Sequence, residues 1–100
     1  MSVRHIVLWR LGADDPDTRA LHAEEVCRRL MALAPIIAEI ESIDVRPNIA
    51  YPGKNWDVAL VADFADVAAL ERYVVHPEHQ KVVEYVRSVT SERAAIDLPI

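Results

Sequence analysis

The sequence predicts an α+β domain in which helices cover one face of a four-stranded antiparallel sheet. Three observations carry this prediction. Apolar residues recur at strand and helix spacings in the order β-α-β-β-α-α-β. The hydrophobic share is 52% and the mean hydropathy is +0.07 in only 100 residues. The first strand is also apolar on both faces. A domain of this size buries only about two-thirds of its surface, so the excess apolar surface predicts a second subunit.

Charge and cysteine content exclude several classes of protein. The net charge is −5, so we expect no nucleic-acid partner. No apolar run approaches the ~20 residues of a membrane span, and the first residues lack the long apolar region of a signal peptide. Cys27 stands alone and cannot form an intrachain disulfide, which favours a reducing compartment. We therefore expect a single cytoplasmic domain over residues 1–100 that binds no membrane.

The first two elements follow from alternation and from helical spacing. Val3 to Leu11 predicts a strand, with residues 5, 7, 9 and 11 on one face and residues 4, 6, 8 and 10 on the other. Asp15 before Pro16 is typical of a helix start. The helix is predicted to end or kink at Pro35. Its apolar stripe comprises Leu21, Val26, Leu30, Leu33 and Ile37, with Cys27 and Ala34 filling it.

The middle of the chain predicts two strands joined by a loop. Ile40 to Val45 is β-branched enough for a strand, and Trp56 to Phe64 alternates between two faces. Residues 46–55 hold two prolines, a glycine and two asparagines between them, so we expect a loop that forms a lid or a rim.

The last third predicts two helices and a final strand. Asp66 caps a short helix that ends before Pro77, and Pro77 opens the next helix. Ala94 to Leu98 is the last strand. The complete order is that of the ferredoxin-like β-α-β-β-α-β arrangement, with helices on one sheet face. Two such sheets facing each other form a dimeric α/β barrel, so we expect a homodimer.

Residues 71–80 gather Tyr73, His76 and His79 around a proline. His79 falls near the start of a helix, where the dipole and free N–H groups favour the neutral imidazole that a general base needs. The structural alternatives are a histidine whose two nitrogens bind backbone and a buried tyrosine whose hydroxyl is hydrogen-bonded. His76 precedes the proline and is expected to face the helix cap. No carboxylates complete a ligand set, so we expect no metal and no cofactor.

Four pieces of the sequence resemble one family. They are Arg4-His5-Ile6-Val7-Leu8-Trp9-Arg10-Leu11, the strand from Trp56 to Phe64, the run Leu70-Glu71-Arg72-Tyr73 followed by His76-Pro77-Glu78-His79-Gln80-Lys81-Val82, and Ile96-Asp97. Together they are similar to the stress-responsive dimeric α/β-barrel (Dabb) domain. The resemblance covers the whole chain and implies the same dimeric barrel, with an activity that is mostly unassigned in the family.

One plant member of that family is a polyketide cyclase, and the resemblance implies roles for three residues. Tyr73 and His79 correspond to its acting tyrosine and histidine, and His5 to a cavity histidine. Val58 stands where that enzyme has a further cavity histidine. The first helix here carries Ala23, Glu24 and Cys27 where the enzyme has aromatic residues, so the pocket differs in shape and polarity.

These observations leave three functional hypotheses open. The first is a protein of unassigned activity that binds a small carbonyl-containing ligand between sheet and helices. The second is a cyclase-like acid/base enzyme that uses Tyr73 and His79 as catalytic residues. The third is a quinol-type monooxygenase on the same barrel, by analogy of fold alone. The expected ligand-binding residues are His5, Val7, Trp9, Val58 and His76, with the 46–56 loop as the rim.

Overall fold

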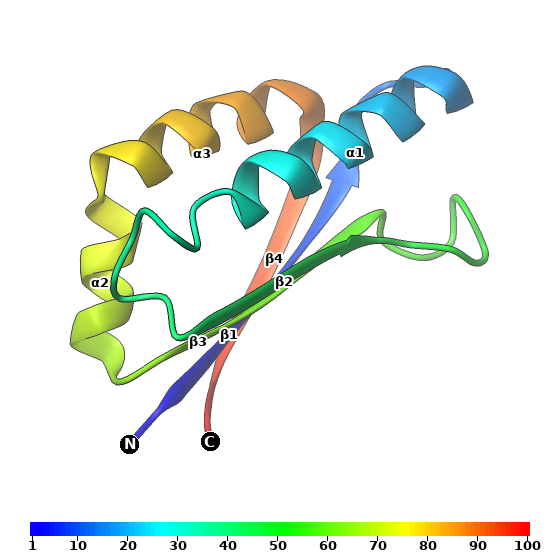
Figure 1. Cartoon of the computed structure of the whole chain (residues 1–100). Coiled ribbons are helices and arrows are strands. Elements are labelled where there is room, and N and C mark those ends of the chain that lie inside the picture. Colours follow the sequence, from blue (N-terminus) through cyan, green and yellow to red (C-terminus); the bar gives the residue numbers. More distant parts are fainter.

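A computed structural model describes all 100 residues, and its elements follow the predicted order. They are β1 (Val3–Leu11), α1 (Pro16–Met31), β2 (Ser42–Pro47), β3 (Val58–Phe64), α2 (Val67–Val75), α3 (Pro77–Val89) and β4 (Thr90–Pro99). The sheet order is β2-β3-β1-β4, and every neighbouring pair is antiparallel. Figure 1 shows the three helices on one side of the sheet, with both termini at the same end. The ferredoxin-like α+β prediction is confirmed.

Capping residues start the helices where the sequence predicts them. Asp15 accepts a hydrogen bond from the Thr18 backbone and caps α1, which Pro16 opens. Asp66 caps α2 in the same way through the backbone N–H of Ala69. Each carboxylate satisfies a donor that the first turn of a helix leaves free. None of the three helices is long and apolar enough to cross a membrane.

The core lies between the helices and one face of the sheet. Along β1 and β3 the buried and less buried positions alternate, so every second side chain points toward the helices. Val7 faces Leu60 of β3 on one side and Ala95 of β4 on the other. Phe64 and Tyr73 are among the largest fully buried side chains. This face of the sheet therefore supplies the floor of any space beneath α3.

The opposite face of the sheet has no helix over it and carries apolar rows. The register places Ile6 between Val61 of β3 and Ile96 of β4. Leu8 lies between two alanines in the next row. Ile96 is 56% exposed and Val61 is 37% exposed. The strand β1 is apolar on both faces, as the sequence indicates, but the helices of the chain cover only one of them.

Several predicted boundaries are wrong by a few residues. The helix α1 ends at Met31, before Pro35, and Leu33 and Ile37 are buried from the turns that follow it. Leu21, assigned to the apolar stripe, is 66% exposed because it lies on the outer side of α1. The strand β2 runs from Ser42 to Pro47 instead of residues 40–45, and β3 starts at Val58 instead of residue 56. The strand β4 begins at Thr90, four residues early, because an edge strand tolerates polar residues that hide its pattern.

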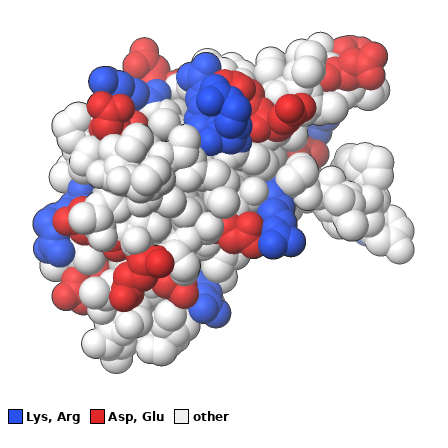
Figure 2. All heavy atoms as spheres, viewed as in Figure 1, with Lys and Arg blue, Asp and Glu red and all other residues white.

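Charged side chains are spread over the surface in pairs. Figure 2 shows lysines and arginines lying beside acidic side chains on this side of the molecule, without a large basic patch. Ion pairs of the chain include Arg4 with Asp63 and Arg72 with Glu39, whose nearest N and O atoms lie 2.9 and 3.0 Å apart. Many of the basic groups are therefore neutralised by acidic neighbours.

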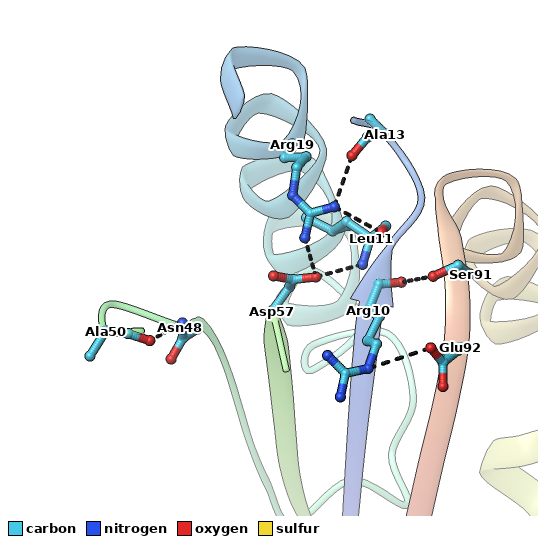
Figure 3. A network of polar contacts seen from close by, with 9 residues as sticks. All are labelled: Arg10, Leu11, Ala13, Arg19, Asn48, Ala50, Asp57, Ser91 and Glu92. Atoms are coloured by element: carbon cyan, nitrogen blue, oxygen red, sulfur yellow. Dashed lines mark hydrogen bonds and ion pairs between the residues drawn. The ribbon is translucent and has the colours of Figure 1, made fainter. Parts of the chain in front are cut away.

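A polar cluster fastens the end of β3 to β1 and α1 (Figure 3). Asp57 accepts a 2.8 Å hydrogen bond from the Leu11 backbone N–H and a 2.6 Å bond from Arg19. Arg19 also donates to the carbonyl oxygens of Leu11 and Ala13. One half-buried ion pair thus connects two strands and the first helix.

Candidate functional site

A cavity of about 310 Å³ lies between the sheet and α3. Its floor comes from His5, Val7 and Trp9 of β1, together with Leu60 of β3. Its walls come from the α2–α3 junction, from one side of α3, from Leu30 of α1 and from Arg93 of β4. Most of the lining is apolar, and the polar side chains in it are His5, Tyr73, His79, Gln80, Arg87 and Arg93. A small apolar cavity with few polar groups is the usual form of a small-molecule site.

The proline between the two helices explains why polar groups gather at one end of this cavity. Because α2 ends at Val75, the carbonyl oxygen of Val74 has no helical partner. His79 donates to it from Nδ1 over 2.9 Å, and Gln80 donates from Nε2 over 2.6 Å. His76 caps α3, where its Nδ1 accepts a hydrogen bond from the Glu78 backbone. The helix junction therefore orients His79 toward the cavity.

The hydrogen bond to Val74 fixes the tautomer of His79. A carbonyl oxygen only accepts, so Nδ1 carries the proton and Nε2 keeps its lone pair when the ring is neutral. Burial lowers the pKa of His79 below its ordinary value of 6.5, and the nearby His5, Arg93 and His76 lower it further, against the opposing hydrogen bond to Val74. His79 is therefore neutral at pH 7 with a free Nε2, as a general base must be.

Tyr73 faces His79 and is a proton donor, whereas His79 is a base. The two ring centroids lie 4.2 Å apart at an interplanar angle of 39°. Burial raises the pKa of Tyr73 to about 12, with Arg93 acting weakly in the other direction. The residue is 1% exposed and lines the cavity, and none of the side-chain hydrogen bonds of the chain involves its hydroxyl. At pH 7 the hydroxyl is therefore a proton donor available to a molecule in the cavity.

His5 is held beside this pair by a residue of the last strand. Its Nδ1 lies 2.6 Å from a carboxylate oxygen of Asp97, which faces it in the sheet register. The His5 ring makes edge contacts with Phe64 and Tyr73, at centroid distances of 6.4 Å. Because the carboxylate accepts from Nδ1, the other ring nitrogen is left for the cavity.

The structure places the residues predicted from sequence in two groups. His5, Val7, Trp9, Tyr73 and His79 line one cavity. Val58 and His76 do not line it: Val58 is buried in the core, and His76 caps a helix. The 46–56 loop contributes no residue to the cavity either. It joins β2 to β3 at the far side of the sheet from β4, so its predicted role as a rim is wrong.

Sequence reasoning missed four polar residues near the site: Gln80, Arg87, Arg93 and Asp97. Gln80 and Arg87 share one side of α3 with Val83, at spacings of three and four residues that place them on a common face. Arg93 faces Trp9 in the register, so a longer final strand would have placed it over the cavity. No group of three or more His, Cys, Asp or Glu side chains is close enough to hold a metal ion.

Comparison with known proteins gives a family and a fold. The model of the Stress responsive A/B Barrel Domain (Dabb) matches residues 3–100. A dimeric protein of unknown function from Bacteroides fragilis is 29% identical over 99% of this chain and 96% of its own, with a TM-score of 0.89. Another from Thermobifida fusca is 26% identical over 100% and 92%, with a TM-score of 0.84.

A named enzyme shares the fold at lower identity. The hydroxynitrile lyase of Passiflora edulis is 14% identical over 99% of this chain and 93% of its own, with a TM-score of 0.80. At this level of identity the likeness concerns the fold alone. None of the curated proteins matches the chain.

Proposed function

The chain belongs to the stress-responsive A/B barrel (Dabb) domain family, and from this premise we propose that its cavity binds a small, partly apolar carbonyl compound and transfers a proton next to the carbonyl group. The pairing of Tyr73 with His79 carries the proposal. One group is a protonated donor and the other a neutral base, and their rings are 4.2 Å apart. Environments that push two pKa values in opposite directions are typical of acid/base sites.

The proposed reaction follows from the free atoms of the site. Nε2 of His79 takes a proton from the carbon next to the carbonyl. The Tyr73 hydroxyl donates a hydrogen bond to the oxygen that gains negative charge as the enolate forms. His5, with Nδ1 fixed by Asp97, presents its other nitrogen to the same space. The His79 imidazolium exchanges its proton with solvent and then gives a proton back to the enolate carbon, so no oxidant or reductant is needed.

The experiment follows exchange of carbon-bound hydrogen in D₂O with 4-phenyl-2-butanone, a neutral methyl ketone that carries a phenyl group at its other end. We expect the protein to speed the loss of the α-proton NMR signals over the buffer rate. His79→Ala should return exchange to that rate. Because this variant also loses the bond to Val74, His79→Asn is the matched control: its amide can donate to the same carbonyl but cannot act as a base.

The outcome for His79→Asn decides the proposal. A folded variant with exchange at the buffer rate supports it. Exchange equal to that of the unmodified protein in either variant contradicts the proposed chemistry. A third outcome would show that these residues only stabilise the helix junction of a non-catalytic protein. In that outcome the unmodified protein shows no exchange, His79→Ala lowers the melting temperature, and His79→Asn restores it.

We also propose that this single domain works as a homodimer through the bare sheet face. The apolar rows around Ile6 and Leu8 support this, because contiguous exposed apolar surface marks interaction sites. The Bacteroides fragilis and Thermobifida fusca relatives are described as dimeric.

A cytoplasmic location also remains our proposal, based on the single cysteine. A quinol monooxygenase activity is suggested only by analogy of fold. An oxygen-consumption assay with quinols would distinguish it from the proposed proton transfer.

A further inference from the structure

Two arginines at the cavity differ from every other arginine of the chain. There are nine arginines, and seven of them form an ion pair with a carboxylate. The two without such a partner are Arg87 and Arg93, and both line the cavity. Neither donates a hydrogen bond to any group of the chain. The positive charges that the protein leaves unpaired on its arginines are thus concentrated at one site.

The local structure aims both side chains at the same space. Arg87 lies one turn after Val83 and two turns after Gln80, and all three line the cavity. Arg93 faces Trp9 across the β1–β4 ladder, so it projects from the helix-covered face of the sheet. Arg93 is also close enough to Tyr73 and His79 to lower the pKa of each. The two guanidinium groups therefore come from adjoining walls, α3 and β4.

We propose that Arg87 and Arg93 bind the carboxylate of an apolar oxo acid whose carbonyl group reaches Tyr73 and His79. The guanidinium fork matches a carboxylate through two parallel hydrogen bonds. The apolar side chains between the two ends, such as Val83 and Val86, suit a hydrocarbon body. The cavity volume of about 310 Å³ lies at the small end of ligand sites, which suits a metabolite better than a nucleotide cofactor.

The helix spacing sets the length of such a ligand. Arg87 comes eight residues after His79, or about 12 Å along a helix axis. Long helical side chains lean back toward the N-terminus, which shortens the gap between the two functional groups. A carbonyl and a carboxylate separated by several carbons therefore fit better than a 2-oxo acid. The probe 6-oxo-6-phenylhexanoate has this separation, and its methyl ester keeps the carbonyl and the body without the charge.

The test measures dissociation constants of the acid and the ester by titration calorimetry. We expect the acid to bind at least about tenfold more tightly than the ester, since charge-assisted bonds are stronger than neutral ones. Arg87→Gln and Arg93→Gln should each weaken acid binding about fivefold or more, and the double variant should bring it to the ester's level. Ester binding should not change. Arg28→Gln, which removes an arginine paired with Glu25 on α1, is the control and should leave both constants unchanged.

Three results of the acid and ester titrations would overturn the inference. They are equal affinity for acid and ester, acid binding that survives the double substitution, and no binding of either compound at millimolar concentration. Inorganic phosphate is the competitor that checks the class of anion. Displacement of the acid by a lower concentration of phosphate would reassign the arginines to a phosphate compound, whereas resistance supports a carboxylate with an apolar body.

This inference rests on the proposed function, because it takes the cavity to be the ligand site, but the two fail separately. Exchange in the neutral 4-phenyl-2-butanone does not require the arginines. Exchange that depends on His79, with no preference for the acid, removes the carboxylate assignment alone. Arginine-dependent acid binding without any exchange removes the proton-transfer chemistry and keeps the carboxylate site.

Discussion

Tyr73 and His79 lie with ring centroids 4.2 Å apart although they belong to different helices, α2 and α3. Their approach depends on the break at Pro77, where one helix ends and the next begins. The same break frees the carbonyl oxygen of Val74 that orients His79. A helix junction and a candidate acid/base pair are therefore one structural feature, so substitutions must be chosen to separate the two roles.

Tyr73→Phe separates them for the tyrosine. The ring keeps its packing against Phe64, and none of the side-chain hydrogen bonds of the chain involves the hydroxyl that is lost. We expect the melting temperature to stay the same, whereas α-proton exchange falls about 100-fold, as is typical when an oxyanion donor is removed. Exchange rates and a thermal melt test this prediction. A lower melting temperature with unchanged exchange would show that the hydroxyl is structural.

His79 should make the protein less stable in mild acid. Its pKa is lowered in the folded state by burial, from an ordinary value of 6.5. Above pH 6.5 both states are neutral at this residue and its contribution to stability is complete. As the pH falls through 6.5 the unfolded chain takes up the proton first, so stability decreases until the lowered folded pKa is passed. Exchange activity should fall over the same acidic range.

The measurement is the free energy of unfolding in urea between pH 7.5 and pH 5, for the unmodified protein and for His79→Asn. The difference between them isolates the contribution of His79 from everything that the two proteins share. We expect the unmodified protein to lose more stability on acidification than the variant. Parallel curves would contradict the lowered pKa.

Ile96→Asp tests the proposed homodimer. Ile96 is 56% exposed and faces Ile6 on the bare side of the sheet, so the monomer should fold with an aspartate there. We expect the variant to change from dimer to monomer in light scattering after size exclusion, because an unpaired charge is costly in an apolar interface. Val67→Asp is the matched control, since Val67 is also 56% exposed but begins α2 on the helical side. Dimers of both variants would place the interface elsewhere.

The sequence predicts the sheet, the helix caps and half of the cavity because each of these has a local signal. Alternation along β1 and β3, the caps at Asp15 and Asp66, and the break at Pro77 are all readable in short windows. The start of β4 is not predicted, because the first residues of this edge strand are polar and show no apolar alternation.

The missing half of the site depends on pairing between distant residues. Asp97 reaches His5 across 92 positions of the sequence, and no short window contains both. Arg93 becomes a cavity residue only through its register with Trp9. The position of the loop at residues 46–56 is predicted wrongly for a related reason. Its composition predicts a loop, but only the strand order shows that it lies away from the cavity.

Asp57→Ala should cost more stability than any exposed ion pair of the chain. The carboxylate accepts from both the Leu11 backbone and Arg19, and its side chain is only 14% exposed (Figure 3). Removing it leaves a strand N–H and a half-buried guanidinium without that acceptor. We expect the free energy of unfolding to fall by about 2 kcal/mol, as is typical for hydrogen bonds to a charged group.

Lys81→Ala is the control for this prediction, because Lys81 forms an exposed pair with Glu78 one turn away on α3. Such pairs contribute about 0.5 kcal/mol or less. Urea unfolding of both variants compares the two directly. Because Asp57 joins β3 to β1 and α1 at the end of the sheet away from Tyr73 and His79, its loss should lower stability while the α-proton exchange of the remaining folded protein is kept. Equal losses in the two variants would show that the cluster at Asp57 stabilises the fold no more than a surface pair does.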